Sequence, residues 1–211
     1  MDISPKISNV VYEDDAGNVI RAEEHAKFEM SSISIDGINN KILLGARSNI
    51  LSFKIKIKGD SNAVSIGEAC KLSGGVNVGK GQGHVLSIGD RTTFQGVSLY
   101  LAESQSITIG DDCMFSARIE IRTTDSHSVI DVDTGKRINP PGSVVIGDHV
   151  WLGKDVIVSK GVILNSNMIV GAKAFVNRSF DEPFIAIAGV PAKIVKNRVN
   201  WSRELISMAD S

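Results

Sequence analysis

The chain has 211 residues, a formal net charge of −1 and 42% hydrophobic residues. This length suits a single domain, and the composition is sufficient for one continuous hydrophobic core. Because 23 basic residues balance 24 acidic ones and no long run carries one sign, the charge pattern gives no indication of binding to nucleic acid or to an anionic membrane surface.

Cys70 and Cys113 are too few and too far apart for a disulfide framework or a zinc motif. We expect both to be reduced thiols packed in the core. The first residues contain no apolar run typical of a signal peptide, and no later segment approaches the ~20 apolar residues of a membrane span. The sequence therefore predicts a cytoplasmic protein without a membrane-spanning segment.

The N-terminal part of the chain is the least regular. Residues 10–22, VVYEDDAGNVIRA, predict a β-hairpin with its turn at 16–18. The stretch ILSFKIKIKG that follows alternates like an exposed strand, and Lys56 interrupts the repeat described next. We expect residues 1–43 to form an N-terminal cap on regular coils that span residues 44–182.

A six-residue repeat organises the rest of the chain. From residue 146 onward every sixth residue is aliphatic, namely Ile146, Leu152, Val158, Leu164, Val170 and Val176. A helix would space apolar residues about 3.6 apart and an ordinary strand 2 apart, so this period indicates short strands separated by corners. Three hexapeptides make one coil of a three-sided prism.

Three earlier coils fit the same register, with inward positions at Ile66, Leu72 and Val78, at Ile88, Phe94 and Tyr100, and at Ile109, Phe115 and Ile121. The coils differ in length, and each excess can be placed after the third side, so the insertions share one corner. The longest is an excursion over about residues 126–144. It begins at His127, where the repeat calls for an aliphatic residue.

The chain ends with a segment of residues 183–211, in which Trp201, Leu205 and Met208 recur at helical spacing. This spacing predicts a short amphipathic C-terminal helix. The hairpin and this helix are candidate caps for the open ends of the solenoid. Ile157, Ile163 and Ile169 occupy outward positions of the coils, and apolar surface of that kind indicates contact between subunits.

The stretches IGDHVWLGKDVIVSKGVILNSNMIVGAKAFV and IAIAGVPAKIVKNR resemble the hexapeptide-repeat acyltransferases, whose fold is a left-handed parallel β-helix. Together with DSHSVID and TGKRIN they are most similar to the O-acetyltransferases of bacterial surface polysaccharides, in particular those of capsules such as polysialic acid. The resemblance covers roughly residues 66–198. It implies an all-β homotrimer that binds acetyl-CoA in the clefts between neighbouring prisms.

The resemblance also implies direct transfer of acetyl from acetyl-CoA to a sugar hydroxyl, without an acyl-enzyme. His127 is our candidate for the general base, because an imidazole with a pKa near 6.5 can take the hydroxyl proton. Asp125, Asp131 and Asp133 are alternative residues for orienting its ring.

Two residues of GDHVWLG are further candidates. The indole N–H of Trp151 can donate to the acetyl carbonyl, or its ring can line the thioester end of the cleft. Packing within the prism is its alternative role. His149 fits the same cleft or a surface corner equally well.

A second group of residues is assigned to acetyl-CoA. Small residues at the corners let the backbone approach the pantetheine arm, and basic residues near the C-terminal end match the phosphates. These candidates are Gly153, Gly171, Ala172, Lys173, Lys193, Lys196 and Arg198. Lys193 is the strongest of the lysines because it belongs to the VPAK motif.

Several other classes of protein use the same prism. The four histidines include no pair with the spacing typical of the γ-carbonic anhydrases, so we expect no metal. An acetyltransferase of a small free sugar or of an amino sugar is an alternative, as is a non-catalytic scaffold, which CoA would not stabilise. The sequence leaves the acceptor sugar and its hydroxyl open.

Overall fold

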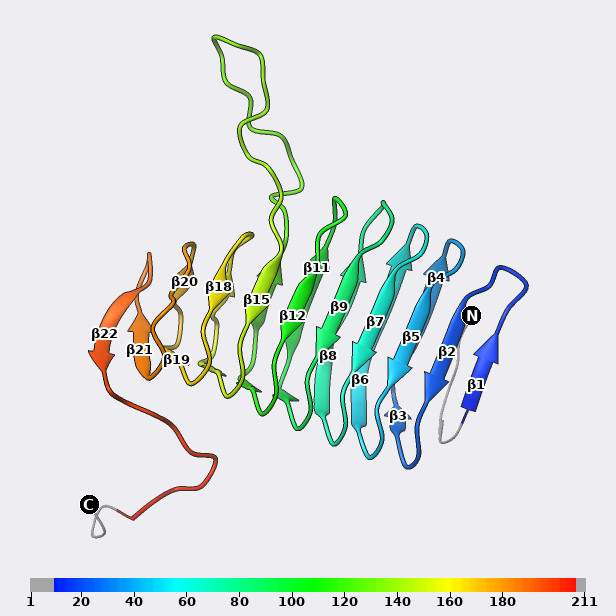
Figure 1. Cartoon of the computed structure of the whole chain (residues 1–211), viewed down its shortest axis with the longest axis horizontal. Coiled ribbons are helices and arrows are strands. Elements are labelled where there is room, and N and C mark those ends of the chain that lie inside the picture. Colours follow the sequence, from blue (N-terminus) through cyan, green and yellow to red (C-terminus); the bar gives the residue numbers. More distant parts are fainter. Residues whose placement is uncertain (1–9, 208–211) are drawn as a thin grey trace.

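The structure is a computed structural model that describes residues 10–207, and these form a three-sided parallel β-helix (Figure 1). One face is an 8-stranded sheet, and the other two faces together make a 14-stranded sheet. They count as one sheet because β6 and β8 continue across the corner between them. The expected all-β fold is confirmed.

The first face contains β2 (Val19–Ala22), β5 (Lys41–Leu44), β7 (Ala63–Ile66), β9 (Val85–Ile88), β12 (Ile107–Ile109), β15 (Val144–Ile146) and β18 (Ile163–Leu164). Strand β1 (Val10–Glu13) pairs antiparallel with β2 and closes this face. The predicted N-terminal hairpin is thus confirmed.

The second face contains β3 (Lys27–Glu29), the first halves of β6 (Asn49–Lys58) and β8 (Lys71–Val78), β10 (Thr93–Phe94), β13 (Met114–Phe115), β16 (Trp151–Leu152), β19 (Ile169–Val170), β21 (Ile185–Ala188) and β22 (Lys193–Asn197). The third face contains β4 (Ser32–Asp36), the second halves of β6 and β8, β11 (Val97–Leu101), β14 (Ile119–Arg122), β17 (Ile157–Val158) and β20 (Phe175–Val176).

The hexapeptide positions face inward and stack from coil to coil. Ile88 pairs with Ile109, which pairs with Ile146 and through it with Leu164, and each of these side chains is at most 2% exposed. Burying such a side chain fully is worth about 1.5–3 kcal/mol. The repeat therefore supplies both the register of the sheets and the core.

Each corner contains a residue with a positive φ angle. At the corner between the first and second faces these are His25, Arg47, Ala69, Arg91, Asp112, His149 and Asn167. One left-handed residue turns the chain sharply between short strands. His149 is therefore one member of a regular series of corner residues.

Small polar side chains inside the same corner satisfy the backbone between coils. Each donates a hydrogen bond to the glycine carbonyl at the same corner of the next coil; these side chains are Ser48, Cys70, Thr92 and Cys113. Burial raises the pKa of the Cys70 thiol to about 11 and that of Cys113 to about 12. Both cysteines are free and buried, as expected.

The coils depart from the predicted register in two places. Gly96, with a φ of 128°, adds a residue at the corner before β11, so Leu99 and Leu101 are buried and Tyr100 is half-buried on the outside. Ser52 has the same effect in β6, where Ile55 and Ile57 are buried and Lys56, which interrupts the repeat, is exposed. The predicted inward position of Tyr100 is wrong.

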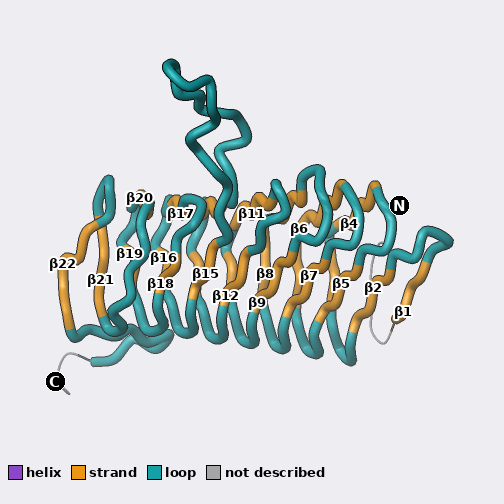
Figure 2. Tube along the Cα trace, turned by 45° about the horizontal axis from the view of Figure 1, so that its top comes forward, coloured by secondary structure: helices purple, strands orange, loops and turns teal. Residues whose placement is uncertain are grey.

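The coils also extend further than residues 44–182. Parallel pairing begins with β2 and β3 and continues to β21, which stacks on β19. At the C-terminal end, residues 198–207, here called the tail, contain no helix (Figure 2). The predicted C-terminal helix is therefore wrong over its described part, and Met208 lies outside the described residues.

The tail is extended because its side chains bind the coils. Trp201 stacks on His149 with ring centroids 4.2 Å apart. Arg203 donates to Asp112 at 2.9 Å and to the carbonyl of Cys113 at 3.0 Å. These contacts lie along several coils, a path that a short helix could not follow.

Candidate active site

Residues 123–143, here called the arm, leave the prism at the corner between β14 and β15 and project away from it (Figure 1). The shorter insertions that follow β8 and β11 lie at the same corner. This arrangement confirms that the insertions share one corner. Ile130 bridges to Arg137, and the amide of Ile138 donates to the carbonyl of Val129 at 2.9 Å, so the outer arm is a hairpin.

Asn139 holds the two strands of the arm together at its base. Its Nδ2 donates to the Asp125 carboxylate and to the His127 carbonyl, both at 2.8 Å. Its Oδ1 accepts from the amide of Val129 at 2.7 Å. The backbone on both sides of His127 is thereby fixed by one amide side chain.

Two ion pairs fasten the arm to the coils. Lys160 lies 2.5 Å from Asp125, and this hydrogen bond, followed by that of Asn139, lowers the pKa of Asp125. Arg137 makes a bidentate pair with Glu103 at 2.5 and 3.0 Å, and Thr124 also donates to Glu103. The contacts from Arg137 and then from Thr124 lower the pKa of Glu103 to about 2.

His127 lines a pocket of about 360 Å³ at the base of the arm, together with Lys80, Tyr100, Glu103, Thr124 and Arg137. Its side chain is exposed. Within residues 10–207 no hydrogen bond to its ring is found. The pocket is polar and open, and an imidazole here can reach a hydroxyl that enters from solvent.

None of the three carboxylates considered for orienting His127 contacts its ring in a single chain. Asp125 binds Asn139 and Lys160. Asp131 instead accepts from the amide and the hydroxyl of Thr134, each at 2.7 Å.

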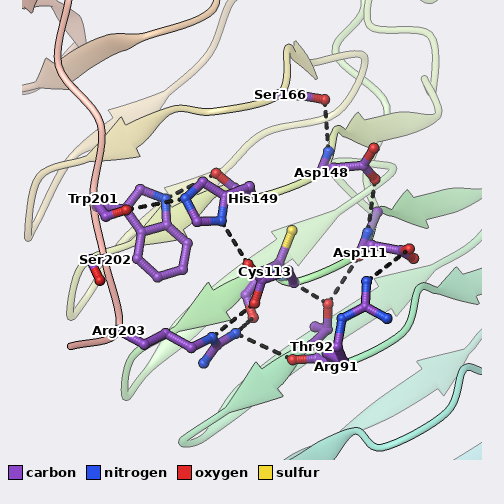
Figure 3. Close-up of polar contacts among 12 residues, drawn as sticks. Arg91, Thr92, Asp111, Cys113, Asp148, His149, Ser166, Trp201, Ser202 and Arg203 are labelled. Carbon is purple, nitrogen blue, oxygen red and sulfur yellow. Dashed lines mark hydrogen bonds and ion pairs between the residues drawn. The ribbon is translucent and has the colours of Figure 1, made fainter.

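Trp151 lies elsewhere, on the second face. His149 lies at the corner where this face begins, against Trp201 of the tail (Figure 3). His149 contacts Asp112 at 2.7 Å and lies beneath the Trp201 ring. Burial raises the pKa of Asp112, but hydrogen bonds from Arg203 and then His149 outweigh it and lower the pKa. His149 therefore anchors the tail and does not line the His127 pocket.

Trp151 faces outward on β16, between Met114 and Ile169 of the neighbouring coils. Its ring lies 6.2 Å from that of Trp201. Its indole nitrogen is buried, and it has no hydrogen-bond partner among the described residues. A buried N–H without a partner is unfavourable, so this N–H is free to donate a hydrogen bond to an acceptor from outside the described residues.

Among the residues assigned to acetyl-CoA, Gly153, Gly171, Ala172, Lys173 and Lys193 lie near the corner where the second face ends. A Cβ on Gly153 would lie 2.7 Å from the Ala172 nitrogen, and Ala188, which follows the same ladder, pairs with Lys193. Lys173 is an exposed corner residue there with a φ of 62°. Arg198, which follows β22, lies at the opposite edge of this face.

Two separate groups of candidate residues therefore belong to one chain. His127 lies at the corner between the third and first faces, whereas Trp151 and the small residues lie on the second face, across the prism from that corner. The fold does not bring them together within one chain.

Several residues of the His127 pocket were not predicted from the sequence. The repeat places Tyr100 in the core, and Lys80 and Glu103 belong to short insertions without a recognisable motif. Arg137 and Asn139 lie in the TGKRIN segment, which carries part of the family resemblance but indicates no role for either residue. That segment was the available signal.

Within residues 10–207 no cluster of three or more histidine, cysteine or acidic side chains could hold a metal ion. The described part of the chain also has no helix long and apolar enough to cross a membrane.

Comparison with known proteins gives a consistent picture. No family model matches the chain. It is 35% identical to a polysialic acid O-acetyltransferase of Neisseria meningitidis over 200 residues, covering 92% of this chain and 89% of the relative. A polysialic acid O-acetyltransferase of Escherichia coli O1:K1 is 33% identical over 149 residues, covering 68% of this chain and 47% of that protein.

Solved structures agree with the sequence relatives. The crystal structure of the polysialic acid O-acetyltransferase OatWY matches with a TM-score of 0.87 and 34% identity over 92% of both chains. That of the polysialic acid-specific acetyltransferase NeuO matches with a TM-score of 0.70 and 26% identity, covering 91% of this chain and 94% of that one. The expected left-handed parallel β-helix is the fold of these neighbours. By its fold and by its similarity along almost its whole length, the chain belongs to the family of these polysialic acid O-acetyltransferases.

Proposed function

We propose that this protein transfers acetyl from acetyl-CoA to a hydroxyl of a capsular polysaccharide, with a sialic acid polymer as the acceptor. The observation that carries the proposal is the pocket of about 360 Å³ in which His127 lies exposed at the base of a firmly held arm. The relatives named above support the acceptor class. We also propose that the reaction takes place in the cytoplasm, as expected from the reduced cysteines.

In the proposed mechanism His127 removes the proton from the sugar hydroxyl as its oxygen attacks the thioester carbonyl of acetyl-CoA. The indole N–H of Trp151 donates to the developing oxyanion, a contact that typically contributes about 10²- to 10³-fold in rate. The tetrahedral intermediate then collapses, CoA leaves as the thiolate, and the proton on His127 is available to that leaving group. The atoms balance without an acyl-enzyme.

The proposal requires more than one chain, because His127 and Trp151 lie on opposite sides of a prism. We infer a homotrimer in which the arm of one subunit reaches the second face of its neighbour. Ile157 and Ile163, which are 40% and 49% exposed, supply apolar surface for such contacts. Gly153, Gly171, Ala172, Lys173 and Lys193 then bind acetyl-CoA in the same cleft, and Arg198 reaches its phosphates only from the far edge of the face.

The test is a transfer assay with purified protein, acetyl-CoA and a panel of acceptors. We expect acetylation of polysialic acid and none of galactoside, maltose or nucleotide-linked amino sugars. The His127→Ala variant should lower kcat by about a hundredfold or more while the KM for acetyl-CoA changes little, because general-base help is worth about 10²- to 10⁴-fold. Near-normal turnover of this variant would remove His127 from the reaction.

A further inference from the structure

A hollow of about 460 Å³ on the described surface is distinct from the His127 pocket. We call it the groove. It lies on the third face, at the corner with the second face, where Gly74, Gly75 and Gly96 carry no side chains. Gly74 cannot be replaced easily, since its φ is 123° and a Cβ would lie 2.1 Å from the carbonyl oxygen of Val97. The groove is thus built into the backbone of the coils.

The groove is lined by three cations and by no carboxylate. Lys54 and Lys56 point outward from β6, and Arg118 is the corner residue directly before β14. Arg118 is paired with Asp155 at 2.5 and 2.8 Å. Lys54 and Lys56 form no ion pair within residues 10–207, so their charges are available to a ligand.

The groove and the His127 pocket share a border. Asn77 lines the groove, and its register partner on β11 is Tyr100, which lines the pocket. Neighbouring strands lie about 4.8 Å apart, so these two side chains are adjacent on the outer surface. Strands β8 and β11 end at the same corner as β14, from which the arm leaves the prism. A long ligand can therefore occupy both hollows at once.

We propose that the groove binds the acceptor polymer: carboxylate-bearing sugar units that lie a few units away from the one that reacts in the His127 pocket. This inference rests on the proposed function and deepens it. Lys54 and Lys56 pair with successive carboxylates, while Asn77 and the open glycine backbone contact the sugar rings. The consequence is a preference for long acceptors over short ones, because only a long chain reaches the lysines.

The proposal is tested with the double variant Lys54→Glu/Lys56→Glu. The matched control is Lys27→Glu/Lys41→Glu, which makes the same charge change at exposed lysines of β3 and β5 on the other two faces. Kinetics are measured with long polysialic acid, with a sialic acid dimer and with varied acetyl-CoA. We expect the groove variant to raise the KM for the long polymer about tenfold and to leave the other two KM values and kcat within about twofold.

Salt provides a second readout. Activity on the long polymer should fall as salt rises in the native protein and in the control, because the Debye length shortens from about 10 Å at 0.1 M. The groove variant should lose most of this dependence. Equal effects on the long and short acceptors, or an equal effect in the control variant, would overturn the proposal.

Direct binding separates failure of the groove from failure of the proposed function. Polysialic acid, heparin and neutral dextran are titrated into the native protein and into both double variants, without acetyl-CoA. We expect polysialic acid to bind the native protein and the control variant but not the groove variant, and we expect dextran to bind none of them. If heparin binds more tightly than polysialic acid, the groove is a general polyanion site and the proposal is contradicted.

Analytical ultracentrifugation completes the test, since a changed oligomeric state in the groove variant would show that the groove is a subunit contact instead. If no acceptor is acetylated at all, the proposed function fails, and the binding result still decides the groove.

Discussion

In the N-terminal coils, a polar residue from each coil lies inside the corner between the third and first faces. Asn18, Asn40 and Asn62 are buried and form a ladder in which each amide donates to the one before it. His84 continues the ladder, fully buried, with Nδ1 2.7 Å from the Asn62 oxygen. Its Nε2 accepts from the amide of Ser104 at 3.0 Å, so the ring is neutral and Nδ1 carries the proton.

This histidine predicts an acid-sensitive fold. Burial lowers the pKa of His84 below its usual 6.5, so the unfolded chain binds a proton more readily than the folded one. Stability should therefore be highest above pH 6.5 and fall as the pH drops below it, by at most about 1.4 kcal/mol per pH unit. Urea unfolding between pH 7.5 and 5 checks this.

The His84→Asn variant keeps the ladder chemistry and removes the titrating ring. We expect its stability to lose most of this dependence on pH. A control with His25→Asn, at an exposed corner, should keep it. The same slope in all three proteins would show that another group is responsible.

At the scale of elements, the arm is the part whose shape matters most for catalysis. It is not stacked between coils, so its shape depends on Asn139 and on the ion pairs Arg137–Glu103 and Lys160–Asp125. Asn139 touches the backbone of His127 and not its ring, so it acts as a positioning residue.

The Asn139→Ala variant should lower kcat about tenfold or more and leave the KM for acetyl-CoA nearly unchanged, because a small displacement of a base is costly. The melting temperature should change little, since the coils do not depend on the arm. Lys136→Ala, at the exposed outer arm, is the matched control and should retain native kcat. A normal kcat in the Asn139 variant would show that the arm is held without it.

At the scale of the whole molecule, the proposed site forms only between subunits. Coexpression of His127→Ala with Trp151→Ala chains tests this. Random mixing in a cyclic trimer leaves roughly a quarter of the sites with both native residues, so activity should recover to about that fraction although each parent is nearly inactive. Mixing His127→Ala with Asn139→Ala places both changes on the same arm and should give no recovery. Recovery there, or none in the first mixture, would contradict a shared site.

The sequence by itself determined the prism, because the six-residue repeat is a local pattern in which every aliphatic residue must face one core. It also located His127, since a polar run at a position that calls for an aliphatic residue marks where the core pattern stops. Corners were less predictable: one left-handed residue, such as Gly96 or Ser52, shifts the register without changing the composition. Tyr100 was misplaced for that reason.

Only the tertiary structure decided how the outer residues are used. The helical spacing in the tail does not produce a helix, because contacts of Trp201 with His149 and of Arg203 with Asp112 stabilise the extended tail more than helical hydrogen bonds would. These partners are far away in the sequence. Likewise, the contacts of Asn139 and the border between the groove and the His127 pocket depend on which coils lie side by side. A repeat fixes what points inward, whereas the outer surface is set by contacts between coils that the repeat does not encode.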